Sequence, residues 1–142
     1  MYGKVIGLVG ILFVLFISFV PAFALDELER ASISNPKLVN AFGLPIGNNV
    51  NVDQQIQISA DITNNQDKSQ SFVYLVQIKD KTNFVVSFGW FSGELNPHQT
   101  WNTSVFWIPD NPGEFTAEIF LWEALINHKA LTKYTTLQIN VS

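Results

Sequence analysis

Cysteine is absent from all 142 residues of this chain. No disulfide can therefore stabilise the fold, so the hydrophobic core has to do so alone. Thiol nucleophiles, zinc sites with cysteine ligands and blue-copper centres are excluded for the same reason.

Basic residues are also scarce. Lysine and arginine number 8 against 12 acidic residues, which gives a net charge of −4 at pH 7. They form no cluster or stripe along the chain. Since nucleic-acid binding depends on neutralising phosphates with basic side chains, we expect no nucleic-acid partner. The mild negative charge favours solubility.

The residues that commonly carry catalysis are few. His98 and His128 are the two histidines, and both lie in polar turns. No serine lies in a G-x-S-x-G elbow, and no H-x-x-x-H pair is available to hold a metal. We therefore expect a protein that is not an enzyme and has no catalytic residue, metal site or cofactor.

One acidic cluster surrounds a Pro-Gly pair in the stretch "PDNPGEF", residues 109–115. Asp110, Asn111 and Glu114 lack the alternate spacing and the distal bidentate glutamate of a calcium loop. Pro112 and Gly113 are instead the residues of a tight turn, because proline fixes φ and glycine accepts a positive φ. The cluster predicts a turn that starts a strand.

The N-terminus has the pattern of an export signal. Lys4 is the one charge before Asp26, an apolar run covers residues 5–20, and Ala22-Phe23-Ala24 follows Pro21. This order predicts a helical secretory signal peptide over residues 1–24. A retained membrane anchor is the alternative, since the run is long enough to cross a bilayer of ~30 Å. Either way we expect an extracellular or cell-surface location, with membrane contact only through an uncleaved leader.

The remainder shows the pattern of strands and turns. Residues 25–35 are polar and predict an exposed lead-in, and residues 36–142 predict one domain with its first strand over residues 37–43. Ile56, Ile58, Ala60 and Ile62 alternate with polar residues, which is typical of a half-buried strand. About seven such strands, with no amphipathic helix, predict an all-β, Ig-like seven-stranded antiparallel β-sandwich.

Three motifs carry a family resemblance: "VDQQIQISADITN" (residues 52–64), "LNPHQT" (95–100) and "WIPDNPGEF" (107–115). With them the chain resembles secreted Ig-like domains of the CARDB and fibronectin-III-like kind, found in archaeal and bacterial surface proteins. His98 stands where glycine is common in that group. Phe115 stands where tyrosine is common, and it has no hydroxyl for a tyrosine-corner hydrogen bond. The resemblance implies the fold and an adhesion, spacer or recognition role.

Aromatic residues are numerous for a small sandwich. In the strand expected over residues 114–122, Phe115, Ala117, Ile119 and Leu121 form one apolar face, which leaves Phe120 and Trp122 on the other. If this strand pairs with residues 71–79, as in Ig sandwiches, further apolar residues join them on the outer face. The predicted interaction face is Val73, Leu75, Trp90, Phe91, Phe120 and Trp122. The alternative is that residues 25–42 or 123–133 fold over it.

These patterns predict a non-catalytic extracytoplasmic module of the cell envelope that binds a protein partner, or a second copy of itself, through this face. Carbohydrate binding by stacked tryptophans is one alternative. Another is a protease-inhibitor-like domain that presents residues 44–49 or 126–133. Two sequons begin at Asn102 and Asn140 and make these residues candidate glycosylation sites, so a glycan is a further candidate partner.

Overall fold

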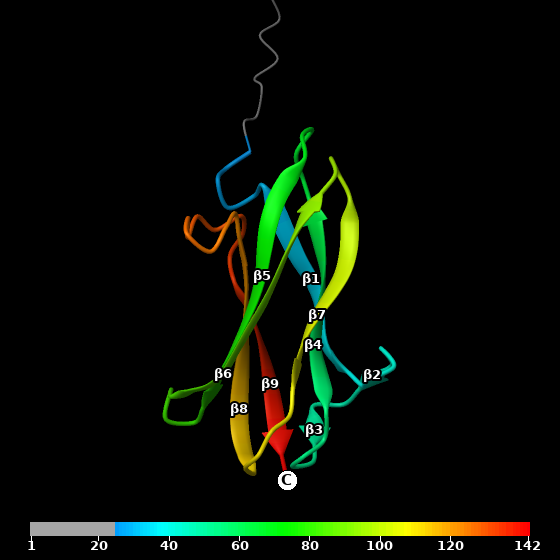
Figure 1. Cartoon of the computed structure of the whole chain (residues 1–142), viewed down its shortest axis with the longest axis vertical. Coiled ribbons are helices and arrows are strands. Elements are labelled where there is room, and N and C mark those ends of the chain that lie inside the picture. The colour runs from blue at the N-terminus through cyan, green and yellow to red at the C-terminus, as the bar shows by residue number, and fades with distance from the viewer. Residues whose placement is uncertain (1–24) are drawn as a thin grey trace, which may run out of the picture.

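The computed structural model describes residues 25–142, which form two β-sheets packed face to face (Figure 1). One sheet has the strand order β2-β1-β4-β7 and the other β3-β9-β8-β5-β6. No helix occurs in this range, and hence none that is long and apolar enough to cross a membrane. The expectation of an all-β sandwich is confirmed. The predicted signal helix or anchor, residues 1–24, lies outside the described residues.

The strands follow one another along the chain with short connections, except for the longer segment before β9. Their bounds are β1 Ala31–Val39, β2 Pro45–Ile46, β3 Asn49–Val50, β4 Ile56–Asn64, β5 Gln70–Asp80, β6 Val85–Leu95, β7 Thr100–Trp107, β8 Gly113–Trp122 and β9 Thr135–Val141.

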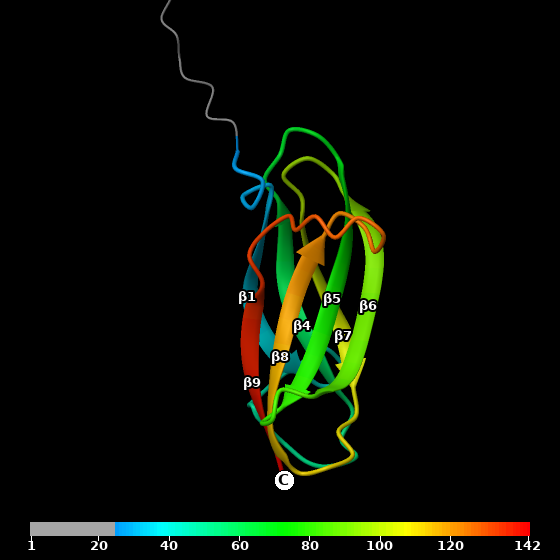
Figure 2. The same ribbon diagram turned by 90° about the vertical axis from the view of Figure 1, so that its left-hand side faces the viewer.

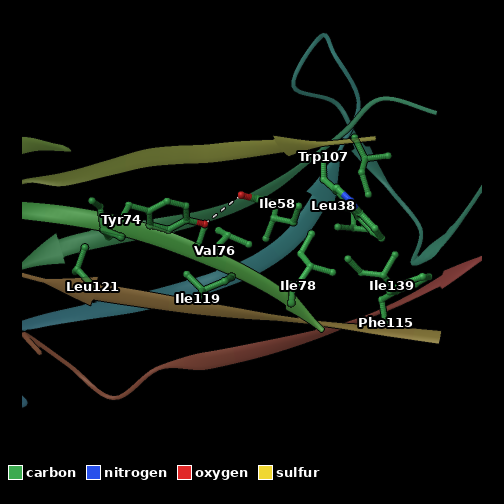
Figure 3. Close-up of a cluster of buried hydrophobic side chains, with 14 of the residues drawn as sticks. Leu38, Ile58, Tyr74, Val76, Ile78, Trp107, Phe115, Ile119, Leu121 and Ile139 are labelled. Carbon is green, nitrogen blue, oxygen red and sulfur yellow. Dashed lines mark hydrogen bonds between the residues drawn. The ribbon is translucent and has the colours of Figure 1, made fainter. Parts of the chain in front are cut away.

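Alternation within the strands builds the core. Ile56, Ile58, Ala60 and Ile62 of β4 are all fully buried, as their period of two predicts. They face inward-pointing side chains of β5, β8 and β9 (Figure 3). Tyr74 extends across this layer, and its hydroxyl donates a hydrogen bond to the carbonyl oxygen of Ile58, 3.1 Å away.

The first strand differs from its prediction. β1 begins at Ala31, inside the segment expected as a lead-in, and ends at Val39 rather than Gly43. Asn35 has a φ of 50°, and the register with β4 shifts between Ser34 and Lys37. This bulge accommodates Pro36, which has no N–H group to donate to a regular ladder. Pro36 therefore lies inside β1 and does not mark the start of the fold.

Two further differences concern the short strands. β2 and β3 have two residues each, and the sequence pattern did not predict them as separate strands. β3 pairs with β9 in parallel, with Asn49 opposite Asn140, so the sandwich is not purely antiparallel. Runs this short carry no alternation, and their pairing depends on where the loop before β4 lies.

The predicted turns are found at their expected places. The Asp80 amide donates to the Phe84 carbonyl at 2.9 Å, which closes the hairpin between β5 and β6. Gly113 has a φ of 148° at the start of β8, a conformation that glycine adopts readily. His98 has a φ of 58°, so this turn uses a left-handed residue at the position where the resembling domains have glycine.

Candidate interaction surface

The pairing of β5, β6 and β8 brings most of the predicted interaction face together. Leu75 lies opposite Trp90 on β6 and Phe120 on β8, and Val73 lies opposite Trp122. The pairing of residues 71–79 with the strand of Phe120 and Trp122 is therefore confirmed. These five residues share the outer face of the five-stranded sheet, which faces the viewer in Figure 2.

Phe91 is the exception, and its place on the outer face was wrong. It pairs with Tyr74, whose side chain points into the core, so Phe91 also points inward. Its ring lies 5.8 Å from that of Phe72 and 5.6 Å from that of Trp101, edge to face in both cases. Adjacent residues of a strand point to opposite faces, so Trp90 and Phe91 cannot share one.

Val73 and Leu75 lie on the outer face but are not accessible to a partner. Their exposed fractions are 4% and 0%. β5 lies between β6 and β8, so Leu75 is flanked by Trp90 and Phe120, and Val73 lies beside Trp122. They form the floor of the surface, and among the six predicted residues the accessible apolar atoms of this face belong to Trp90, Phe120 and Trp122.

The segment between β8 and β9, residues 123–134, folds back toward the outer face. Its anchor is Leu131, which is fully buried and whose amide donates to the carbonyl of Leu121 at 2.9 Å. Arg30, just before β1, forms an ion pair with Glu123 and donates to the carbonyl of Ala130 at 3.1 Å. In Figure 2 this orange segment extends across the upper ends of β8 and β5 toward β6.

Two rings from the segment between β8 and β9 pack on Phe120 and Trp122. Tyr134 stacks on Phe120 with 5.2 Å between ring centroids, and His128 lies 5.0 Å from Trp122. Phe120 and Trp122 are consequently half-buried. Residues 123–133 thus cover part of the outer face, as the alternative prediction held. Sequence reasoning missed Tyr134 and His128, because residues outside a strand have no alternation to place them.

Two hollows remain on either side of this cover. One, of about 670 Å³, lies between Trp90 on β6 and residues 124–126, with Val73 at its floor. Ile126 stands at its rim with an exposed fraction of 98%. The other, of about 450 Å³, is lined mainly by apolar and aromatic side chains, with Lys133 at its edge.

The outer face of the four-stranded sheet is different in character. Asp61 accepts hydrogen bonds from Asn35 at 2.8 Å and Asn102 at 2.9 Å, and Ser59 lies beside Asn102. These hydrogen bonds lower the pKa of Asp61, that from Asn35 first. Phe106 is the large exposed apolar residue on this face. Several aromatic side chains therefore gather on the outer face of the five-stranded sheet, whereas Phe106 stands apart on a polar face.

The candidate glycosylation sites lie on strands. Asn102 is exposed on β7, and its amide group donates to Asp61. Asn140 is exposed on β9 and donates to the side-chain oxygen of Asn49 at 3.1 Å. Both amide nitrogens that would carry a glycan are thus engaged in hydrogen bonds. Glycosylation stays a prediction.

The acidic turn forms no metal cage. Asp110 accepts from the neighbouring Asn111, and Glu114 points toward Lys81 with 3.7 Å between the charged groups. Among residues 25–142, no three histidine, aspartate or glutamate side chains gather in a way that could hold a metal ion. Nε2 of His98 lies 2.6 Å from Oδ1 of Asp67 at the surface. His128 instead packs against Trp122.

Comparison with known proteins identifies the fold. No family model matches the chain, and no curated protein does. Among solved structures, a CARDB domain from Pyrococcus furiosus, crystallised with two metal ions, is 13% identical, with a TM-score of 0.55 over 80% of this chain and 94% of that one. The C-terminal domain of Wzt is 12% identical, with a TM-score of 0.61 over 80% of this chain and 74% of that one.

Enzymes are matched only in part. A β-glucosidase from Erythrobacter marinus is 12% identical, with a TM-score of 0.56, and the match covers 79% of this chain but 15% of the enzyme. At such identities the likeness concerns architecture alone. The chain has the Ig-like β-sandwich fold seen in CARDB and Wzt C-terminal domains.

Proposed function

We propose that this chain is a non-catalytic interaction module that binds a protein partner through the outer aromatic face of β5, β6 and β8. The observation that carries the proposal is the hollow between Trp90 and Ile126. Trp90 is 50% exposed and Ile126 98% exposed, and both border an apolar floor. Contiguous exposed apolar surface of this kind is typical of protein interaction sites.

The chemistry of the rim suggests the complementary partner. Glu94 is exposed beside Trp90, whereas Glu123 is already neutralised by Arg30. A partner that inserts one apolar side chain and places a lysine or arginine near Glu94 would match this surface. Burying the exposed part of Trp90 and Ile126 contributes on the order of 2 kcal/mol each, which suits a transient contact.

The place of action is part of the proposal. The charge-poor apolar run with its Ala-Phe-Ala site predicts export, so the partner is expected to be an extracytoplasmic protein. The chain then serves as a recognition module in the cell envelope.

Site-specific photo-cross-linking in the host envelope tests this. The full chain carries a photoreactive residue at Ile126, and a matched chain carries it at Phe42, which is 89% exposed in the connection between β1 and β2. We expect a discrete protein adduct from position 126 that position 42 does not give. Trp90→Ser should reduce its yield at least fivefold. Equal adducts from both positions, or no effect of Trp90→Ser, contradict the proposal.

Carbohydrate binding is the second candidate, and one observation weighs against it. Stacking on a sugar needs open, coplanar rings, yet Trp122 is inclined by 56° to Phe120 and lies against His128. The inhibitor alternative stays a prediction. Its first loop, residues 44–49, contains β2, and the carbonyl of Asn48 accepts from the Asn140 amide at 2.8 Å.

A further inference from the structure

β6 is an edge strand. It pairs with β5 on one side, and no strand of the described residues pairs with its other side. Alternate residues of an edge strand direct their N–H and C=O groups away from the sheet, where they can bind another strand. β6 has 11 residues, so this free edge is long.

The edge lacks the usual protection against strand addition. From Thr82 to Gly93 the sequence has neither a charged residue nor a proline. Phe88 is 54% exposed, and Val85, Val86 and Trp90 are exposed as well. Natural sheets guard long edges with lysine, proline or bulges. The one register shift against β5 lies near the hairpin, and pairing is continuous from Ser87 to Leu95.

β7 lies close to this edge but does not pair with it, since it belongs to the other sheet. A side-chain β-carbon at Gly89 would lie 2.4 Å from Cγ1 of Val105, so the two strands pack tightly at this point. Beyond it, residues 87–91 and 104–108 line a hollow of about 520 Å³. The free edge therefore has apolar surface beside it for an incoming strand.

The charges at the ends of the strand indicate which strand fits. Lys81, in the hairpin just before β6, and Glu94, near its end, are both exposed. When an edge pairs with a copy of itself around a two-fold axis, the start of each strand lies beside the end of the other. An axis near Phe88 sets each Lys81 near the Glu94 of the second copy.

We propose that two copies of this chain associate by antiparallel addition of β6 to β6, which joins the two five-stranded sheets into one. This goes beyond the proposed function, because the dimer uses the backbone edge of β6 and leaves the hollow between Trp90 and Ile126 free. Trp90 borders both surfaces, so the tests of the dimer use other residues.

Cysteine scanning tests the proposal directly, because the chain has no cysteine of its own. Single variants Val86→Cys, Phe88→Cys and Ser92→Cys are made in the full chain, with Thr136→Cys on exposed β9 as the control. Mild oxidation should yield disulfide-linked dimers at one of the β6 positions at least tenfold faster than at position 136. Equal rates at β6 and at position 136 overturn the proposal.

Charge reversal tests the antiparallel direction. Glu94→Lys should weaken dimerisation about fivefold, given two charge pairs of ~0.5 kcal/mol each. Adding Lys81→Glu should restore it. Lys81 also lies 3.7 Å from Glu114, so the restoration by the double variant carries the result. Glu27→Lys, an equal charge change at an exposed position outside the strands, is the control and should have no effect. A double variant as weak as Glu94→Lys overturns the proposal.

Phe88→Lys separates this dimer from the binding of another protein. Two lysines facing one another across the axis should convert the dimer to a monomer in sedimentation analysis, while the adduct from position 126 persists. A dimer that survives Phe88→Lys overturns the β6 pairing. If Phe88→Lys abolishes both the dimer and the adduct, the pairing of β6 with β6 is supported. The proposal that the surface at Ile126 binds another protein independently of the dimer is then contradicted.

Discussion

The hydroxyl of Tyr74 on β5 donates a hydrogen bond of 3.1 Å to the carbonyl oxygen of Ile58 on β4, and so joins the two sheets through the core (Figure 3). Phe115 cannot form the tyrosine-corner bond that resembling domains use. This chain places a tyrosine hydroxyl elsewhere, fully buried and paired with the opposite sheet.

Tyr74→Phe should lower the free energy of unfolding by about 1–2 kcal/mol, because it removes one buried hydrogen bond while conserving the ring. Urea denaturation followed by tryptophan fluorescence measures the change. Tyr134→Phe is the matched control, since Tyr134 is exposed and its ring alone contacts Phe120. Equal effects of the two variants would contradict the role of the cross-sheet bond.

The same tyrosine should make stability fall in alkali. Burial raises the pKa of Tyr74 in the folded state above its unfolded value of about 10. Its contribution is therefore fully present below about pH 10 and is lost as the pH rises through the raised pKa. The stability difference between the wild type and Tyr74→Phe should shrink as the pH rises from about 10 to about 12. A difference that stays constant over this range would refute the argument.

Substitutions at Leu75 and Trp122 should distinguish a residue that mainly stabilises the fold from one that mainly contributes to binding. Leu75→Ala leaves a cavity at a fully buried position and should cost about 2–5 kcal/mol of stability. Trp122→Ser removes a half-buried ring and should cost less, while it weakens the adduct formed from position 126. Denaturation curves and cross-linking yields of the two variants give the comparison, and a larger stability loss for Trp122→Ser would show that this ring serves mainly the fold.

Gly89→Ala should destabilise the sandwich by about 1–3 kcal/mol, since its new β-carbon would lie 2.4 Å from Cγ1 of Val105. Without that contact, glycine to alanine within a strand stabilises by roughly 0.5–1 kcal/mol. Val105→Ala introduced beside Gly89→Ala should therefore recover part of the loss. A double-mutant cycle with no coupling would place the strain elsewhere.

His98→Gly should stabilise the turn between β6 and β7 by about 0.5–1 kcal/mol, because His98 has a φ of 58°, which costs an L-residue but not glycine. The lost contact with Asp67 lies at the surface and contributes little. Asp67→Asn, which weakens that contact and keeps the turn, should leave the midpoint of thermal unfolding almost unchanged. A lower midpoint for His98→Gly would contradict the conformational argument.

Local patterns in the sequence were sufficient wherever one residue and its near neighbours decide the outcome. The period of two placed Ile56 to Ile62 in the core, and Phe115 to Leu121 likewise. The Pro-Gly pair before β8 and the Asp80–Asn83 hairpin followed from the backbone preferences of those residues. The same rule of alternation was enough to separate Phe91 from Trp90.

Features that depend on residues distant in the chain did not follow from the sequence. The burial of Leu75 results from two neighbouring strands whose register no local pattern contains. The partial cover of Trp122 depends on Arg30, which holds residues 123–130 from 93 positions away. The bulge at Pro36 likewise depends on the partner strand β4.

The sequence by itself thus determined the fold class and the inward face of its long strands, because alternation and turn preferences act over a few residues. Only the tertiary structure decided which apolar side chains form a floor, which stay accessible, and which strand is left at an edge. Those outcomes depend on strand order and on packing between distant segments, and the free edge of β6 with the groove beside Trp90 results from both.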